Sequence, residues 1–325
     1  MNQTLQSLST ATAWCPRISL PCTDRQLATI LQPLLSHAPH RPVELACDDL
    51  TAAEQLPPSL PNDCQLLLCC PIVRSQDIPR LTTLAMAHSV TVVVGHFRHV
   101  ELVAAAAQAA RQTISILVEL SLGRQLSGIT AGPDAASLIA ATRRRSELKL
   151  RGLFLRNPCQ VETDPELQRR ALQSGLTMCQ HTLQMLRPDG SENSAASHAA
   201  DCCIVLGQLP VELLPDFHGS AVCNPLPVET STTAPGAINP ETDAGIPALV
   251  VTRPNLELCV VACFPAITMD NKCQWLVPAP AGAVVIDQID HYFTLQVSGP
   301  ALDLKIGDEI RLKIPTPTNQ NQPIT

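Results

Sequence analysis

The chain has 325 residues, of which 45% are hydrophobic and 16% are charged. This length fits one (β/α)₈ barrel with a smaller domain, or two medium domains, and the apolar fraction excludes wholesale disorder. The formal net charge of −7 and a single short basic run, Arg143, Arg144 and Arg145, argue against nucleic acid as a partner.

Membrane association is not expected either. The longest apolar stretches, residues 102–107 and 246–251, are far shorter than the ~20 residues that a membrane-spanning helix needs. Residues 1–13 are polar with no basic start, and we expect a flexible N-terminus there rather than a targeting segment. These features predict a soluble protein of the cytoplasm.

Residues 14–208 alternate apolar runs with alanine- and leucine-rich stretches, which is typical of a parallel sheet with crossover helices. Seven runs are apolar enough for buried parallel strands: residues 17–22, 42–47, 65–70, 90–95, 115–122, 149–155 and 202–206. Helices are predicted between them, several with an aspartate at the N-terminus: residues 24–35, 78–88, 99–112, 134–145 and 164–186. With an eighth strand near residues 220–223, this order predicts a TIM-like (β/α)₈ barrel.

The pattern changes in residues 209–315. A loop rich in Pro, Thr and Gly is predicted over residues 224–247. After it, alternating apolar residues predict an antiparallel β domain with strands at 248–252, 256–263, 282–288, 292–297 and 309–314. Residues 316–325 have too little apolar content to dock, so we expect a flexible tail.

The fourteen cysteines follow neither a disulfide framework nor the paired spacings of zinc sites. We interpret most of them as small buried hydrophobic residues with reduced thiols. Cys259 with Cys263, and His96 with His99, have spacings that would allow metal binding. The cysteine pair lies on a predicted strand, where residues four apart share a face in any case, so neither pair is predicted to hold a metal.

Several short strings, spread over most of the chain, together resemble one family. They are VELAC at 43–47 with AEQL at 53–56, ELSLGRQLSGI at 119–129, LRGL at 150–153, DH at 290–291 and LKIGDEI at 304–310. In order and spacing they resemble the fold-type III pyridoxal phosphate enzymes, in particular the D-threonine aldolase and D-serine dehydratase branch with its alanine racemase-like N-terminal domain. The resemblance implies a barrel followed by a β domain, a cofactor held as a lysine imine, a metal site and a dimer.

The lysine that the resemblance implies is missing. Such enzymes carry it on the first barrel strand, because the cofactor is exchanged from that amine onto the substrate amine. Residues 17–22 contain no lysine, and the four lysines of the whole chain lie later, at Lys149, Lys272, Lys305 and Lys313. An arginine cannot replace the lysine, because its guanidinium stays protonated and is not a nucleophile.

Three other parts of the implied site also differ. The glycine- and hydroxyl-rich phosphate turn corresponds to residues 203–210, with one glycine and no hydroxyl. Arg156 stands where the family strand ends in tyrosine, and Leu126 stands where the family has arginine. The His-x-Cys metal pair corresponds to residues 317–319, which offer no such ligand, and His291 is left as the one candidate metal ligand.

Barrels of this type bind ligands at the C-terminal ends of their strands, where polar residues form our candidate site. We predict an anion-binding mouth made by four arginines and their neighbours: Arg74, Arg98, Arg124 and Arg156, with Asn157 and Asp48. His96 is the candidate proton-transfer residue, because imidazole titrates near neutral pH. The alternative interpretations are ion-paired or solvated arginines and a structural histidine.

These observations predict a degenerate, function-shifted homologue without a bound cofactor and without lyase activity. It would bind a small anionic metabolite or a partner subunit, which is a second copy of the chain or an active paralogue. The alternative is a pyridoxal phosphate-dependent lyase or aldolase that acts on D-3-hydroxy amino acids and captures the cofactor by another route. A third possibility is a different barrel chemistry that uses His96 and the arginines.

Overall fold

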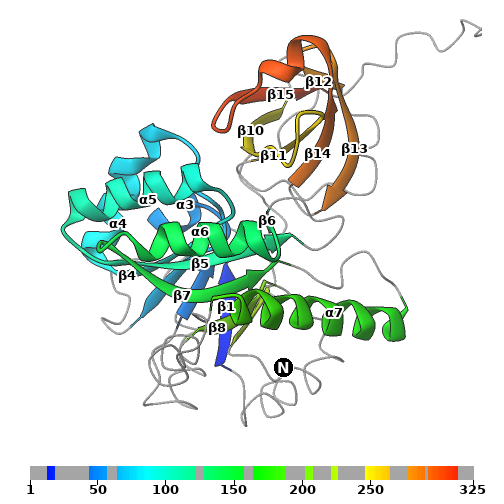
Figure 1. The fold of residues 1–325 in the computed structure, drawn as a ribbon. Coiled ribbons are helices and arrows are strands. Elements are labelled where there is room, and N and C mark those ends of the chain that lie inside the picture. Colours follow the sequence, from blue (N-terminus) through cyan, green and yellow to red (C-terminus); the bar gives the residue numbers. More distant parts are fainter. Residues whose placement is uncertain are drawn as a thin grey trace, which may run out of the picture. The chain divides into compact units, whose positions relative to one another are not determined.

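The computed structural model describes residues 13–18, 44–56, 64–121, 128–156, 164–186, 202–207, 221–225, 246–263, 277–289 and 292–313. The chain divides into two compact units, Met1–Val228 and Glu229–Thr325 (Figure 1). Each unit has its own cluster of buried hydrophobic residues, so each is described separately.

The first unit contains a closed ring of parallel strands. In ring order the strands are β1 (Ala13–Ile18), β2 (Glu44–Cys47), β3 (Gln65–Leu68), β4 (Ser89–Val94), β5 (Ile114–Ser121), β7 (Leu148–Leu155), β8 (Cys203–Leu206) and β9 (Ala221–Pro225). Each strand pairs with the next one, and β9 pairs with β1 to close the ring. A short additional strand, β6 (Ile129–Thr130), pairs with β5. The predicted TIM-like barrel is confirmed, with its eighth strand at β9. Its first strand was predicted at residues 17–22 and lies at Ala13–Ile18 instead.

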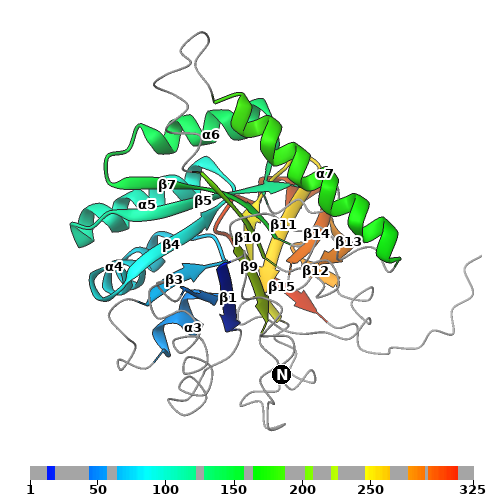
Figure 2. The ribbon, with the colours of Figure 1, turned by 90° about the horizontal axis from the view of Figure 1, so that it is seen from below.

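Helices lie outside the strands (Figure 2). They are α3 (Leu50–Glu54), α4 (Ile78–Ala87) preceded by the 3₁₀ turn η1 (Ser75–Asp77), α5 (Phe97–Ala110), α6 (Pro133–Arg143) and α7 (Pro165–Gln184). Asp164 caps α7 by accepting from the backbone N–H groups of Glu166 and Leu167, as its sequence position predicts. The helix predicted over residues 24–35 lies outside the described residues. No described helix combines the length and the apolar character that crossing a membrane would need.

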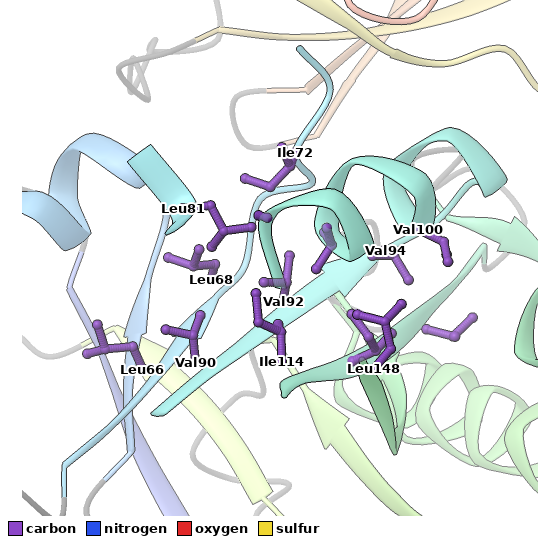
Figure 3. Packing of buried hydrophobic residues seen from close by; sticks show 14 of the residues in the cluster. Leu66, Leu68, Ile72, Leu81, Val90, Val92, Val94, Val100, Ile114 and Leu148 are labelled. Atoms are coloured by element: carbon purple, nitrogen blue, oxygen red, sulfur yellow. The ribbon is translucent and has the colours of Figure 1, made fainter. Parts of the chain in front are cut away.

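The larger core lies between the strands and the helices. Successive strand residues point to opposite sides, so alternate residues of each strand face the helices. Figure 3 shows Leu66 and Leu68 of β3 and Val92 of β4 in this layer, with Leu81 of α4 and Val100 of α5. Because the strands are buried on both sides, their sequences are nearly continuous apolar runs, which is what made them predictable.

The residues between those positions fill the barrel interior. A separate buried cluster collects the inner side chains of six strands: Ala46, Leu67, Cys69, Val93, Leu117, Phe154 and Val205. Phe154 is the only aromatic residue in this cluster and is 1% exposed. The interior is therefore a packed apolar layer, and charged side chains that point inward lie above or below it.

The second unit is an antiparallel sheet of six strands in the order β12-β15-β10-β11-β14-β13. The strands are β10 (Ile246–Thr252), β11 (Leu258–Cys263), β12 (Val277–Ala279), β13 (Ala283–Ile289), β14 (Tyr292–Val297) and β15 (Glu309–Lys313), with a 3₁₀ turn η4 (Gly299–Asp303). The predicted β domain is confirmed, and the sequence missed only β12. Its VPA sequence contains a proline and no alternation, which fits its place at the edge of the sheet.

The structure describes the side chains of nine cysteines. Seven of them are buried: Cys47, Cys64, Cys69, Cys70, Cys179, Cys259 and Cys263. Cys202 and Cys203 are partly exposed. The burial of these seven agrees with their interpretation as small hydrophobic residues, and their reduced state stays a prediction.

Candidate functional site

Two buried charged residues meet where β5 and β7 approach their C-terminal ends. Glu119 follows the inward-facing Leu117 on β5 by two positions, and Arg156 follows the inward-facing Phe154 on β7 by two positions, so both continue the inner face. Arg156 Nε donates to Glu119 Oε1 at 2.8 Å, and Nη2 donates to Oε2 at 3.0 Å. The two side chains are only 3% and 2% exposed. The result is a two-pronged ion pair removed from water.

Two further contacts fix the guanidinium. Arg156 Nη2 also donates to the main-chain carbonyl of Cys69, just after β3, at 2.7 Å. The guanidinium carbon lies 5.5 Å from the centroid of the Phe154 ring, within the range of a cation–π contact. Arg156 is therefore held by groups from β3, β5 and β7, and it lies at the end of the barrel where ligands bind in this fold.

Glycines pack against the backbone behind both charged residues. A Cβ on Gly128 would come within 2.6 Å of the Glu119 carbonyl oxygen. A Cβ on Gly207 would overlap the Arg156 carbonyl oxygen and lie 2.8 Å from Phe154 Cζ. The Gly207 N–H donates to the Leu155 carbonyl at 2.7 Å. Only glycine fits at positions 128 and 207, because a Cβ at either position would overlap the neighbouring backbone. The Gly207 N–H is already used in a hydrogen bond within the protein backbone.

Acidic and thiol groups lie near the same end of the barrel. Asp48 is buried directly after β2, and Asp49 caps α3 by accepting from the Ala52 N–H at 2.7 Å. Burial raises the pKa of Asp49, and the bond from Ala52 opposes this shift. Burial also raises the pKa of the Cys70 thiol, the nearby Asp49 raises it further, and Arg156 lowers it. The thiolate form of Cys70, which is the nucleophilic form, is therefore disfavoured.

Two other predicted arginines have carboxylate partners of their own. Arg74 bonds Asp77 through Nε at 3.1 Å and Nη2 at 3.2 Å. Arg98 is exposed on α5 and bonds Glu101 at 3.1 Å. Together with Arg156 and Glu119, these pairs agree with the ion-paired interpretation, and an anion-binding mouth stays a prediction. Arg124, Asn157 and His291 lie outside the described residues.

His96 follows β4 after one residue, Gly95, and is the N-cap of α5. Its Nδ1 accepts from the Arg98 backbone N–H at 3.0 Å, which makes it a helix cap. Burial lowers the pKa of His96, and Glu101 opposes this shift. The ring of His99 lies 5.8 Å from it, fully buried, with Nδ1 accepting from the Gly95 N–H. The structure thus gives His96 a capping role, and a role in proton transfer is untested.

A second charged pair lies inside the barrel near the opposite ends of the strands. Arg151 sits at an irregularity in the β5–β7 register and bonds Glu44 of β2 through both terminal nitrogens, with Nη2 to Oε2 at 3.0 Å. Its Nη1 also donates to Thr91 Oγ1 at 3.3 Å. Neither Glu44 nor Glu119 was predicted from the sequence as a site residue. The available signal was a charged residue within an apolar strand run, as in ILVEL around Glu119.

The comparisons with known proteins agree with this architecture. A parallel barrel followed by an antiparallel β unit is the arrangement of the fold-type III pyridoxal phosphate enzymes. Residues 43–204 match the family model described as the alanine racemase N-terminal domain, and through this domain the chain belongs to that family. A comparison with curated protein sequences found no match. Enzymes of this family normally depend on pyridoxal phosphate.

Solved structures of this fold resemble the chain at low sequence identity. The D-threonine aldolase from Filomicrobium marinum is 16% identical with a TM-score of 0.53, over 96% of this chain and 81% of that one. The D-threo-3-hydroxyaspartate dehydratase from Delftia sp. HT23 is 14% identical with a TM-score of 0.51, over 96% and 85%. The alanine racemase from Clostridium difficile 630 is 12% identical with a TM-score of 0.50, over 97% and 83%. At these identities the likeness concerns the fold.

The described residues do not fit pyridoxal phosphate at the barrel mouth. In the described part of the first unit the one lysine is Lys149, which is exposed, pairs with Ser115 and lies at the start of β7. Because a strand rises about 3.3 Å per residue, Lys149 at the start of β7 lies roughly 20 Å along the strand from Arg156. The Gly207 N–H is bonded to the Leu155 carbonyl, and the Arg156–Glu119 pair is buried at the C-terminal ends of β5 and β7. No amine and no open phosphate cradle come together among these residues.

Proposed function

We propose that the chain is a function-shifted relative of the fold-type III enzymes that binds a small anionic ligand at the C-terminal mouth of its barrel. It does not hold pyridoxal phosphate as a lysine imine and does not catalyse the family's lyase or racemase reactions. The observation that carries the proposal is the buried guanidinium of Arg156 at the end of β7, with Glu119 and Cys69 as its partners. A permanently charged group at the ligand-binding end of a barrel suits a carboxylate or phosphate.

We propose the absence of a lysine imine because forming an imine needs an amine at the reacting position. The first barrel strand, β1, has the sequence AWCPRI and contains no lysine. Arg156 cannot take over the role, because a guanidinium keeps its proton and does not attack a carbonyl. The charge of Arg156 can orient an anion, but the guanidinium cannot form the covalent link.

The test of the cofactor part uses the visible spectrum of the purified protein with added pyridoxal phosphate. We expect no imine absorbance band and no stoichiometric mass gain at one lysine after borohydride reduction. The Lys149→Arg variant is the control, because it removes the one described lysine of the barrel while keeping the charge. A saturable, borohydride-stable adduct on the wild-type protein would contradict the proposal.

The test of the binding part measures the midpoint of thermal unfolding with added acetate or inorganic phosphate. Chloride at equal ionic strength serves as the reference. A ligand that binds the folded protein raises this midpoint, and the rise saturates with concentration. We expect a rise with one of these anions that is lost in Arg156→Met. Equal midpoints in all three salts would count against an anion site at the mouth.

The second candidate function is a pyridoxal phosphate-dependent lyase or aldolase acting on D-3-hydroxy amino acids. It is favoured by the likeness in fold to structures named D-threonine aldolase and D-threo-3-hydroxyaspartate dehydratase. It requires cofactor capture by a residue outside those described. Cofactor-dependent breakdown of D-threonine or D-threo-3-hydroxyaspartate, abolished by borohydride, would establish this function in place of the first.

A further inference from the structure

The guanidinium in the barrel mouth already holds a carboxylate, which is that of Glu119. Two parallel bonds, at 2.8 and 3.0 Å, join the Arg156 fork to both carboxylate oxygens. The Cys69 carbonyl accepts a further N–H from Nη2, and the Phe154 ring lies against the guanidinium. These contacts orient the fork toward one planar anion, and Glu119 provides it from within the chain.

We infer that Glu119 is a tethered occupant of a carboxylate-binding site, and that the chain keeps this site closed with its own side chain. The inference rests on the proposed function, because it describes the anion site of that function and how it is regulated. It also narrows the ligand class to small carboxylates, since the filled position has the size and planarity of an acetate ion.

Burial and backbone packing explain why Glu119 holds this position. The side chain is 2% exposed, and Gly128 lies so close behind it that a Cβ there would meet the Glu119 carbonyl oxygen at 2.6 Å. β5 is paired on both sides, with β4 and with β7, so the strand that carries Glu119 is fixed within the ring. A tethered group competes at an effective concentration of about millimolar or more, so a free carboxylate has to displace Glu119 and binds the wild-type protein more weakly than it would bind the emptied site.

The experiment removes the tether and supplies the missing group in solution. Glu119→Ala deletes the atoms of one acetate ion and leaves Arg156 and the rest of the site in place. We titrate wild type, Glu119→Ala and the double variant Glu119→Ala/Arg156→Met with sodium acetate, and compare sodium chloride at equal ionic strength. The readout is the midpoint of thermal unfolding. If Glu119→Ala does not fold in chloride, the readout is the fraction that refolds in acetate relative to chloride.

We expect acetate to bind Glu119→Ala about tenfold or more tightly than wild type, the ratio that one charge-assisted hydrogen bond supplies. The gain should be absent in the double variant. Equal effects of acetate and chloride on Glu119→Ala would overturn the inference. The two proposals fail separately: wild-type binding without a gain in Glu119→Ala removes the inference alone, and a gain in Glu119→Ala without wild-type binding removes the proposed function alone.

Discussion

Two arginines of β7 place positive charge inside the barrel, and each faces a glutamate from another strand. Arg156 and Glu119 are 3% and 2% exposed, whereas Arg151 is 28% exposed and its partner Glu44 is 9% exposed. Water can replace part of a lost interaction at the second pair and almost none at the first. The two pairs are therefore a matched comparison of the same chemistry at two depths.

Removing one partner of the buried pair should be costly. We expect Arg156→Met to lower the free energy of unfolding by about 3–5 kcal/mol, because Glu119 would lose its guanidinium in a site without water. Arg151→Met should cost less. The double variant Glu119→Leu/Arg156→Met should recover part of the loss, because it leaves no buried charge. Urea unfolding followed by circular dichroism measures all of these, and equal losses for both arginines would contradict the argument.

A histidine gives the stability a predictable pH dependence. His96 caps α5 through Nδ1, which cannot accept a hydrogen bond once it is protonated, and burial lowers its pKa. As the pH falls, His96 therefore takes up a proton in the unfolded chain before it does so in the folded protein. The stability that His96 contributes is fully present above about pH 6.5 and is lost as the pH falls through the lowered pKa of the folded protein. Burial lowers the pKa of His88 as well, which adds a loss of the same sign.

Unfolding in urea between pH 7.5 and 5 tests this prediction. The variant His96→Asn keeps a good helix-capping residue and cannot titrate, so we expect a weaker loss of stability on acidification than in wild type. His88→Asn provides the comparison for the second histidine. An unchanged pH dependence in His96→Asn would show that the imidazole of His96 does not contribute.

At the scale of single elements, one hydroxyl joins two helices. Thr182, fully buried on α7, accepts from the backbone N–H of Gly132, which precedes α6, at 3.1 Å. Gly132 has φ of 96°, so its backbone takes a conformation that other residues rarely adopt. The hydroxyl also donates to the Met178 carbonyl one turn earlier at 2.9 Å. Thr182 therefore determines where α6 begins relative to α7.

The substitution Thr182→Val keeps the shape and removes the acceptor. We expect a loss of about 1–3 kcal/mol in the free energy of unfolding, because a buried backbone N–H loses its partner. Thr177→Val is a matched control on the same helix, since the exposed Thr177 hydroxyl bonds only the Gln173 carbonyl at 2.8 Å among the bonds described. A similar cost for both variants would show that the bond to Gly132 adds nothing.

Strand and helix positions were predictable because each follows from local pattern. β4 and β5 are continuous apolar runs with helical stretches between them, and the eight-strand order follows from their alternation. Pairing across the barrel leaves no such local signal. Glu119 and Arg156 are 37 positions apart, and Glu44 and Arg151 are 107 apart, so their partners emerge only when the ring closes. For that reason the sequence identified Arg156 as a site residue but did not identify the carboxylate that occupies it.

For the whole molecule, the central feature is the presence of two separate cores. One buried cluster spans the strands and helices of the barrel, and another is confined to the antiparallel sheet. The composition changes after residue 208, but the last barrel strand, β9 (Ala221–Pro225), comes after this point, and the division between the units lies after Val228. Because each unit buries its own apolar residues, we expect each to unfold cooperatively by itself.

Buried thiols provide a probe in each core. Cys47 and Cys179 belong to the barrel cluster, and Cys259 and Cys263 belong to the sheet cluster. Burial raises the pKa of Cys179 to about 12 and that of Cys259 to about 11, which disfavours the reactive thiolate form of these two residues in the folded protein. These thiols should react only when their own unit opens, whereas the partly exposed Cys202 should react in the native state.

A short pulse of iodoacetamide along a urea gradient, read by peptide mass spectrometry, measures the opening of each unit. We expect Cys47 and Cys179 to share one midpoint and Cys259 and Cys263 to share another, because each pair is protected by one cooperative core. Cys202 should be labelled without urea and serves as the internal control for the pulse. One common midpoint for all four buried thiols would contradict separate unfolding of the two units.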